Sequence, residues 1–216
     1  MIRVTKIEPT ASYEQKVRIP GEAFLALNPL PTREQFKRND FWTEIHDEMY
    51  DAYQGICMYC ASWTPRTPTG ASLWQSSIDH FIPKGVFPKL AYDWSNFRLC
   101  RNDINTNKGE DLYVPDPFAI RNDWFAIDFA TWRVGPSETA PIYVRNRIRS
   151  SFVRLGLNED AYVEERQAAA AIYVHRPAER DELELLYPFL IAELARQSEG
   201  TALLNELRGI LSPPGV

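Results

Sequence analysis

The stretch from Ser77 to Glu110 constrains this chain more than any other, because its polar residues follow in a defined order between short apolar runs. Asp79 and His80 open it, Asn96 lies in its middle and Asn105 stands near its end. On an extended strand, the side chains of Asp79 and His80 would point to opposite faces. They reach one site only where the strand ends or bends, and the proline and glycine that follow closely are consistent with such a bend.

The ordered set DHFIPK, YDWSN, FRLC and N-x-x-K-G resembles the catalytic segment of HNH endonucleases, also called ββα-metal nucleases. The resemblance implies an α+β fold, with a ββα-metal nuclease core flanked by helices and a helical C-terminal region. The first strand would cover residues 72–81, the second FRLC, and RNDINTNK would form the helix. Asn105 and Lys108 would then share one helical face at a spacing of i and i+3.

The resemblance further implies hydrolysis of DNA phosphodiester bonds by a one-metal mechanism. Asp79 and Asn105 are the expected ligands of Mg²⁺ or Mn²⁺, because hard cations prefer oxygen ligands. His80 is the expected general base, since an imidazole titrates near working pH. Asn96 is expected to support catalysis by orienting the histidine or by bracing the loop.

The cysteines depart from the pattern of many HNH proteins, which clasp a structural zinc with two Cys-x-x-Cys pairs. Cys57 and Cys60 form a first pair, but Cys100 has no partner, because an isoleucine takes the place of the fourth cysteine. Three cysteines are a weak indication of zinc. Either His46 or Asp103 supplies a fourth ligand, or the knuckle is degenerate and its cysteines pack as small apolar groups. We favour the degenerate knuckle, so that a structural zinc is doubtful.

The composition is that of a globular protein, with 44 % hydrophobic and 12 % aromatic residues in a chain of 216. A formal net charge of −5 counts against a free-standing, tight DNA binder, and suggests that a partner or a local patch grips the phosphate backbone. Three cysteines do not resemble a secreted disulfide frame. Neither a signal peptide nor a membrane-spanning apolar run is evident. We therefore expect a cytoplasmic protein.

Three segments are expected along the chain: an N-terminal segment with a helix (1–54), the nuclease core (55–118), and a strand pair or hairpin followed by a helical region (119–216). Residues 1–7 are expected to form a short strand. Thr32 and Gln35 have the spacing of a capping box, and they predict a helix that runs to Gln54 and stops at Gly55. Alternating apolar residues predict the hairpin near 124–136.

A second candidate for substrate contact is a run of four arginines without an intervening acid, in the helical stretch that begins near Pro141. Arg145 and Arg149 would share one face of that helix, and such a cluster on an acidic protein suits a DNA backbone. The alternative is a solvated face that pairs with Glu164 and Glu165. The expected phosphate contacts are thus Lys84, Lys108, Arg145 and Arg149.

Residues 55–175 look like the HNH subunit of Septu-type and retron-associated anti-phage defence systems. The resemblance rests on CMYC, DHFIPKGVFPKLAYDWSNFRLC and LGLNEDAYVEERQ. It implies a bacterial anti-phage complex with a separate ATPase subunit of the ABC or SMC type, because no ATPase motif is present in this sequence. Two alternatives stay open: a catalytically silent HNH scaffold that acts as an interaction subunit, and an RNA nuclease that cuts, for example, tRNA.

Overall fold

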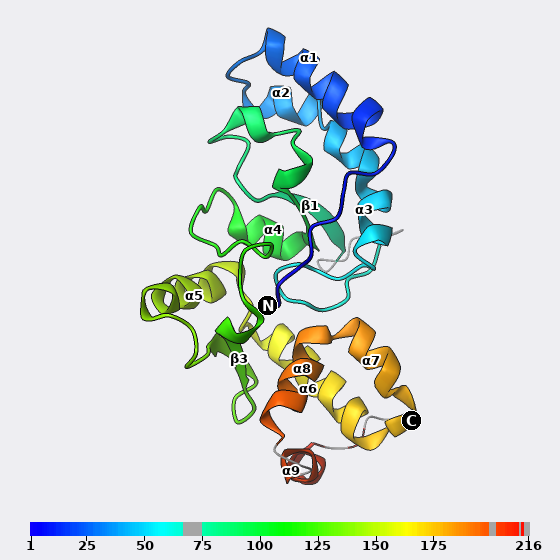
Figure 1. The fold of residues 1–216 in the computed structure, drawn as a ribbon, viewed down its shortest axis with the longest axis vertical. Helices are drawn as coiled ribbons and strands as arrows, with labels where there is room; N and C mark the ends of the chain where they lie inside the picture. Colours follow the sequence, from blue (N-terminus) through cyan, green and yellow to red (C-terminus); the bar gives the residue numbers. More distant parts are fainter. Residues whose placement is uncertain (67–74, 199–201, 212, 214–216) are drawn as a thin grey trace.

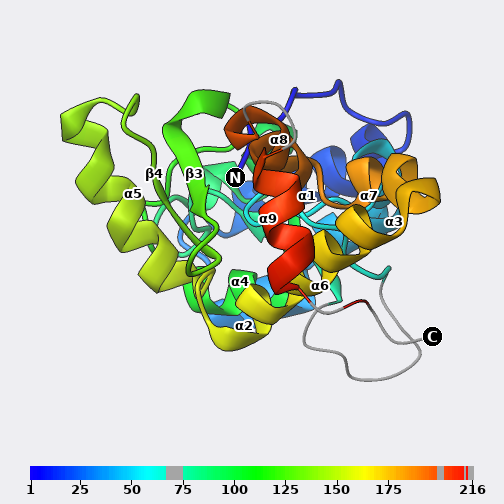
Figure 2. The same cartoon turned by 90° about the horizontal axis from the view of Figure 1, so that it is seen from below.

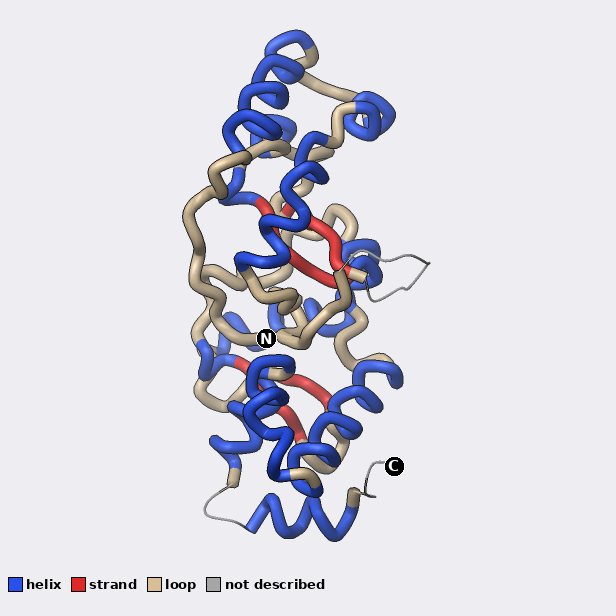
Figure 3. The backbone as a smooth tube through the Cα atoms, turned by 90° about the vertical axis from the view of Figure 1, so that its right-hand side faces the viewer, coloured by secondary structure: helices blue, strands red, loops and turns tan. Residues whose placement is uncertain are grey.

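The computed structural model describes residues 1–66, 75–198, 202–211 and 213. It is an α+β protein, as expected, in which two separate antiparallel strand pairs lie among helices. The two pairs follow each other along the long axis of the molecule (Figures 1 and 3). Within the described ranges, every helix is too short or too polar to cross a bilayer.

The elements occur in the following order along the chain: a π-helical turn Glu14–Arg18, α1 Ile19–Leu27, α2 Arg33–Arg38, a 3₁₀ turn Phe41–Ile45, α3 His46–Ala52, β1 Ser76–His80, 3₁₀ turns Pro88–Leu90 and Trp94–Asn96, β2 Phe97–Arg101, α4 Asn102–Lys108, a 3₁₀ turn Asn122–Trp124, β3 Phe125–Asp128, β4 Arg133–Pro136, α5 Ile142–Leu155, α6 Asp160–His175, a 3₁₀ turn Pro177–Glu179, α7 Arg180–Leu186, α8 Pro188–Gln197 and α9 Ala202–Ile210.

The first sheet pairs β1 with β2, and α4 follows β2 directly and packs against both strands. Ile78 lies opposite Leu99, and Asp79 lies opposite Arg98. Because side chains alternate along a strand, Ile78 and Leu99 face the N-terminal helices while Asp79 faces the side that α4 covers. The strand pair therefore has one apolar face and one that carries charged groups.

This sheet lies between two hydrophobic clusters. The N-terminal cluster joins α1–α3 to one face of the sheet, and its buried members include Tyr13, Val17, Phe36, Ile45, Met49, Met58, Ile78, Tyr92, Trp94, Phe97 and Leu99. The C-terminal cluster joins the other side to β3, β4 and α5–α9, and includes Cys57, Tyr59, Cys100, Ile104, Phe125, Ile148, Phe152, Leu155, Tyr162 and Leu190. Helices α6, α7, α8 and α9 gather at the lower end of the molecule in Figure 1, the end that Figure 2 views from below. The N-terminal cluster thus joins two of the expected segments, and the C-terminal cluster, which also contains Met1, joins all three.

The helix expected from Thr32 to Gln54 forms in three pieces. Its start is confirmed, because Thr32 Oγ1 accepts a bond from the Gln35 backbone N–H at 3.2 Å, and Gln35 Oε1 accepts one from the Thr32 N–H at 2.8 Å. The helix breaks at Asn39, whose side chain donates to the Gln35 carbonyl while Tyr92 donates to the Asn39 carbonyl. These bonds replace those that a continuous helix would make, so α2 ends there.

Two other expectations differ from the structure at the strand level. The strand expected at residues 1–7 is wrong: this segment is irregular, and the Val4 N–H bonds to the Pro117 carbonyl without a ladder around it. The strand expected from residue 72 begins at Ser76, and residues 72–74, including Trp74, lie outside the described ranges. The hairpin expected near 124–136 is confirmed, because β3 and β4 pair in antiparallel register.

Candidate active site

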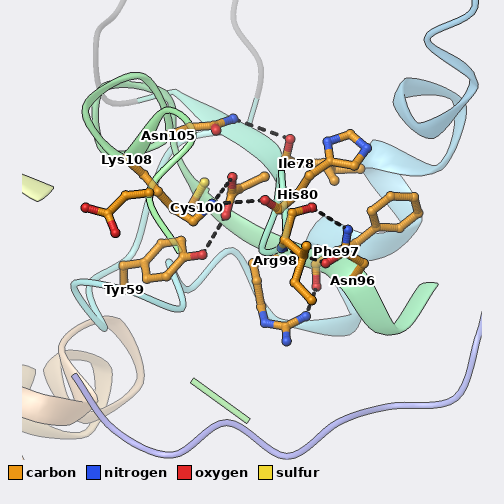
Figure 4. Close-up of polar contacts among 12 residues, drawn as sticks. Tyr59, Ile78, His80, Asn96, Phe97, Arg98, Cys100, Asn105 and Lys108 are labelled. Atoms are coloured by element: carbon orange, nitrogen blue, oxygen red, sulfur yellow. Dashed lines mark hydrogen bonds and ion pairs between the residues drawn. The ribbon is translucent and has the colours of Figure 1, made fainter. Parts of the chain in front are cut away.

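Asp79 is a buried carboxylate with a partner on each oxygen. The Tyr59 hydroxyl donates to Oδ2 at 2.5 Å, and the Lys108 ammonium lies 3.1 Å from Oδ1 (Figure 4). Lys108 also donates to the His80 carbonyl oxygen at 2.9 Å. A buried charge is tolerated when it is paired and hydrogen-bonded in this way. Burial and the Asp79 charge raise the pKa of Tyr59 well above its usual value, so its hydroxyl stays a donor.

The position of Lys108 corrects one expectation. Its spacing from Asn105 places both residues on α4, as predicted, but the Lys108 side chain has no solvent exposure and points at Asp79. In this arrangement the ammonium compensates an internal carboxylate and does not reach a phosphate at the surface. Helical spacing specified the face of α4 and left undetermined how deeply that face would be buried.

His80 ends β1, and its imidazole lies on the other side of the strand pair, near the ring of Phe97 (Figure 4). The ring centroids of Trp42 and Phe97 lie 4.7 and 5.4 Å away, both in edge-on geometry. His80 Nε2 is 2.8 Å from the Ala91 carbonyl oxygen. Since a carbonyl only accepts, Nε2 carries the hydrogen and Nδ1 holds the lone pair. Burial, with a smaller contribution from the charge of Lys84, lowers the pKa of His80 to about 3, so the ring is a neutral proton acceptor at neutral pH.

Asn96 braces the loop between the strands. Its Oδ1 accepts from the Ile82 N–H at 2.7 Å, and its Nδ2 donates to the carbonyls of Ile82 and Leu90 at 2.8 and 3.0 Å. Leu90 directly precedes Ala91, whose carbonyl holds the imidazole of His80. Of the two roles expected for Asn96, these contacts are those of the loop brace, and they act on the histidine only through the backbone.

Asn105 projects from α4 toward the backbone of β1 (Figure 4). Its Nδ2 donates to Ser77 Oγ at 3.2 Å and to the Ile78 carbonyl at 3.4 Å. No described residue donates to its Oδ1, which is therefore available as a ligand. The carboxylate of Asp79 has four lone-pair positions, of which its two partners use two. This donor set of carboxylate and amide oxygens fits a hard divalent cation.

A cavity of about 660 Å³ brings four of the expected site residues together, but not Asn96 or Lys108. Asp79, His80, Lys84 and Asn105 line it, and this size is typical of ligand sites. β1 ends at His80 and a turn follows, so the adjacent side chains of Asp79 and His80 can both border this cavity. Arg33, the first residue of α2, also lines the cavity. The sequence did not indicate this role, because it shows that Arg33 follows the helix cap but not that it lies near the site.

Lys84 lies at this cavity with its ammonium 4.7 Å from the ring centroid of Trp42, in cation–π geometry. Burial lowers the pKa of Lys84, the negative charge of Asp79 opposes that effect, and the positive charge of Arg33 adds to it. The expected position of Lys84 near a substrate is therefore compatible with the structure. The ring of Trp42 contacts both Lys84 and His80.

The cysteines pack in the protein interior. Cys57 and Cys100 are buried, and burial raises the pKa of the Cys60 and Cys100 thiols well above the usual value. Across residues 1–66 and the other described ranges, no three His, Cys, Asp or Glu side chains converge as a metal-binding group. Of the two possible fourth ligands, His46 contacts Ser76 Oγ at 2.9 Å, and Asp103 accepts from the Tyr162 hydroxyl at 2.6 Å.

The arginine run lies on α5, and none of its arginines is among the residues that line the cavity at His80. The Arg145 guanidinium donates to the backbone carbonyls of Glu138 and Ala140. Arg149 is exposed and borders a separate cavity of about 760 Å³ beside β3 and β4. The alternative, pairing of these arginines with Glu164 and Glu165, is not seen in the described ranges, and Glu165 instead forms a buried ion pair with Arg101.

Comparison with protein-family models and with curated proteins finds no match for this chain. The interpretation of the cavity therefore rests on its own residues. Those residues are a neutral histidine with one free ring nitrogen, a buried carboxylate, and an amide oxygen without a donor among the described residues.

Proposed function

We propose that this chain is an HNH endonuclease that hydrolyses phosphodiester bonds of DNA, with His80 as the general base. The observation that carries the proposal is the convergence of His80, Asp79 and Asn105 on one cavity. The succession of β1, β2 and α4 supports it, because this order of elements corresponds to the ββα-metal core that the sequence resembles.

His80 would remove a proton from the attacking water. The bond from Nε2 to the Ala91 carbonyl fixes the tautomer, so the lone pair on Nδ1 is the acceptor. The low pKa keeps this nitrogen unprotonated at neutral pH. A positioned general base contributes about 10²–10⁴-fold, and most when its pKa lies near the working pH, so a pKa of about 3 places this imidazole at the weak end of that range.

Asp79 and the Oδ1 atom of Asn105 would hold a divalent cation, Mg²⁺ or Mn²⁺. Bound there, the cation would neutralise charge on the scissile phosphate and its leaving oxygen. Tyr59 and Lys108 hold the Asp79 carboxylate in a fixed orientation, and the bonds from Asn105 Nδ2 do the same for its amide. The ligands are therefore positioned before any metal binds.

The cellular role that we propose is that of the nuclease subunit of a bacterial anti-phage complex, working with an ATPase partner. This part rests on the sequence resemblance and on charge. A chain with a net charge of −5 gains little affinity from long-range attraction to DNA, so a partner that holds the nucleic acid would supply it.

The experiment is nicking of supercoiled plasmid DNA with Mg²⁺ or Mn²⁺, with and without EDTA. His80→Ala, Asp79→Ala and Asn105→Ala should each lose at least about 10²-fold in rate. His175→Ala is the matched control, because this histidine lies on α6 and contacts the Leu211 carbonyl instead. A folded His80→Ala protein that nicks at the wild-type rate would contradict the proposal, and cutting of RNA in preference to DNA would change the substrate.

One observation favours a second candidate, a catalytically silent HNH scaffold. Both oxygens of Asp79 already have partners, and one of these is the cationic Lys108. A permanent internal cation beside the expected metal ligand would suit a subunit that keeps the fold without the chemistry. Wild-type protein that shows no metal-dependent cutting, alone or with its copurifying partner, would support this candidate.

A further inference from the structure

Arg33 reaches the cavity from a segment that lies outside the motif. It is the first residue of α2, directly after the Thr32 cap. Phe36, one turn later, is buried with its ring centroid 6.4 Å from that of Tyr92, and the Tyr92 hydroxyl bonds to the Asn39 carbonyl at the end of α2. Since Tyr92 belongs to the loop that holds His80, these contacts fix α2 and Arg33 relative to the site.

Arg33 and Lys84 differ from Lys108 in that no ion pair among the described residues compensates their charges. Among the described residues, neither the Arg33 guanidinium nor the Lys84 ammonium forms an ion pair or a hydrogen bond; Lys84 lies over the ring of Trp42. By contrast, Lys108 pairs with Asp79 at 3.1 Å. Two cations of the cavity are thus free to bind an anion.

The other charges of the cavity leave it cationic. The charge of Asp79 is compensated by Lys108. The remaining acid is Glu110, whose carboxylate lies beside the backbone of Gly85. Two cationic side chains and one carboxylate therefore face the space, on a protein whose net charge is −5.

We propose that Arg33 and Lys84 form a clamp for a backbone phosphate of the nucleic-acid substrate, beside His80. This rests on the proposed nuclease function and deepens it, because it brings the N-terminal segment into the substrate site. A guanidinium presents two parallel N–H donors to phosphate oxygens, whereas an ammonium acts as a compact charge. Lys108, buried on Asp79, does not serve this role, so a phosphate in the cavity would take its contacts from these two residues.

The test is binding of a fluorescein-labelled DNA duplex, followed by anisotropy in EDTA so that nothing is cut. Arg33→Ala should weaken binding about tenfold, as expected for loss of a charged hydrogen bond. It should also reduce the slope of log K against log salt by about one. The matched control is Lys37→Ala, because Lys37 is an exposed cation on the same helix that does not line the cavity. Arg33→Lys should recover part of the affinity.

The outcomes separate the clamp from the nuclease function. If the wild type cuts DNA and Arg33→Ala binds no more weakly than Lys37→Ala, the clamp is wrong and the nuclease stands. If binding depends on Arg33 but the wild type cuts nothing, alone or with its copurifying partner, the phosphate site stands and the nuclease proposal fails. A wild type that neither binds nor cuts under both conditions overturns both.

Discussion

Lys108 and Asp79 form an ion pair that is sealed from solvent, with Nζ 3.1 Å from Oδ1 and side-chain exposures of 0 % and 3 %. Asp79 is also the expected metal ligand. Its present partner is therefore a cation supplied by the chain itself, on the same carboxylate that the proposed divalent ion would share. The pair stabilises the fold without metal and lowers the gain from binding one.

Replacing Lys108 with methionine should expose this competition. Removal of one partner of a buried ion pair costs about 3–5 kcal/mol, because the other charge is left uncompensated. In Lys108→Met, a divalent cation can compensate Asp79, so Mn²⁺ should raise the melting temperature of this variant more than that of the wild type. Differential scanning fluorimetry with Mn²⁺ and with EDTA measures the effect.

Arg101→Met is the control for this experiment, because Arg101 forms an equally buried ion pair with Glu165, which is not among the residues that line the cavity. It should lose comparable stability and gain nothing specific from Mn²⁺. Equal responses of the two variants to Mn²⁺ would show that Asp79 does not take a metal.

His80 should give the free energy of unfolding a distinct pH dependence. Burial lowers the pKa of the folded-state imidazole from 6.5 to about 3, so between these values the unfolded chain binds a proton that the folded chain does not. The contribution of His80 to the free energy of unfolding is therefore fully present above about pH 6.5, and it is lost as the pH falls toward 3. The slope is at most about 1.4 kcal/mol per pH unit.

Urea unfolding of the wild type and of His80→Asn at several pH values between 4 and 7 isolates this contribution, because the other titrating groups are common to both proteins. The stability of the wild type should fall more steeply with acidification than that of the variant. Parallel curves would mean that the imidazole is not held neutral by burial.

Asn96 should be intolerant of even a small change. Asn96→Ala leaves the backbone groups of Ile82 and Leu90 without partners, and should cost about 2–4 kcal/mol. Asn96→Asp keeps the acceptor for the Ile82 N–H, but turns an oxygen toward two carbonyl oxygens. It should therefore be no better than alanine in chemical unfolding, and an Asn96→Asp protein as stable as the wild type would contradict the bracing role.

The sequence was most informative where a local pattern decides the structure. The cap of α2 at Thr32 and the hairpin of β3 and β4 both follow from spacings of a few residues. Each of these features is set by neighbours in the chain.

The features that the sequence missed depend on contacts between distant segments. Arg33 and Asp79 border the same cavity although 46 positions separate them in the numbering. Lys108 is buried because Asp79, on another element, needs a counter-charge, and no spacing within α4 encodes that need. The break of the first long helix at Asn39 depends on the hydroxyl of Tyr92, far along the chain.

Tyr92 also makes Gly21 of α1 a sensitive position for the whole site. A Cβ atom at Gly21 would lie 2.7 Å from Cβ of Tyr92 and closer still to its ring. Alanine usually stabilises a helix relative to glycine, but here overpacking should outweigh that gain and cost about 1–3 kcal/mol. Because Tyr92 follows Ala91, whose carbonyl holds the His80 ring, metal-dependent nicking should also fall.

Gly209→Ala in α9 provides the matched substitution, since no described atom lies within 4 Å of the added carbon. It should leave nicking unchanged and raise the free energy of urea unfolding by up to about 1 kcal/mol. The two alanines should therefore shift stability in opposite directions. If Gly21→Ala were as stable and as active as Gly209→Ala, the N-terminal helices would not be packed on the loop that carries the histidine's partner, and the placement of Arg33 at the cavity would lose its support.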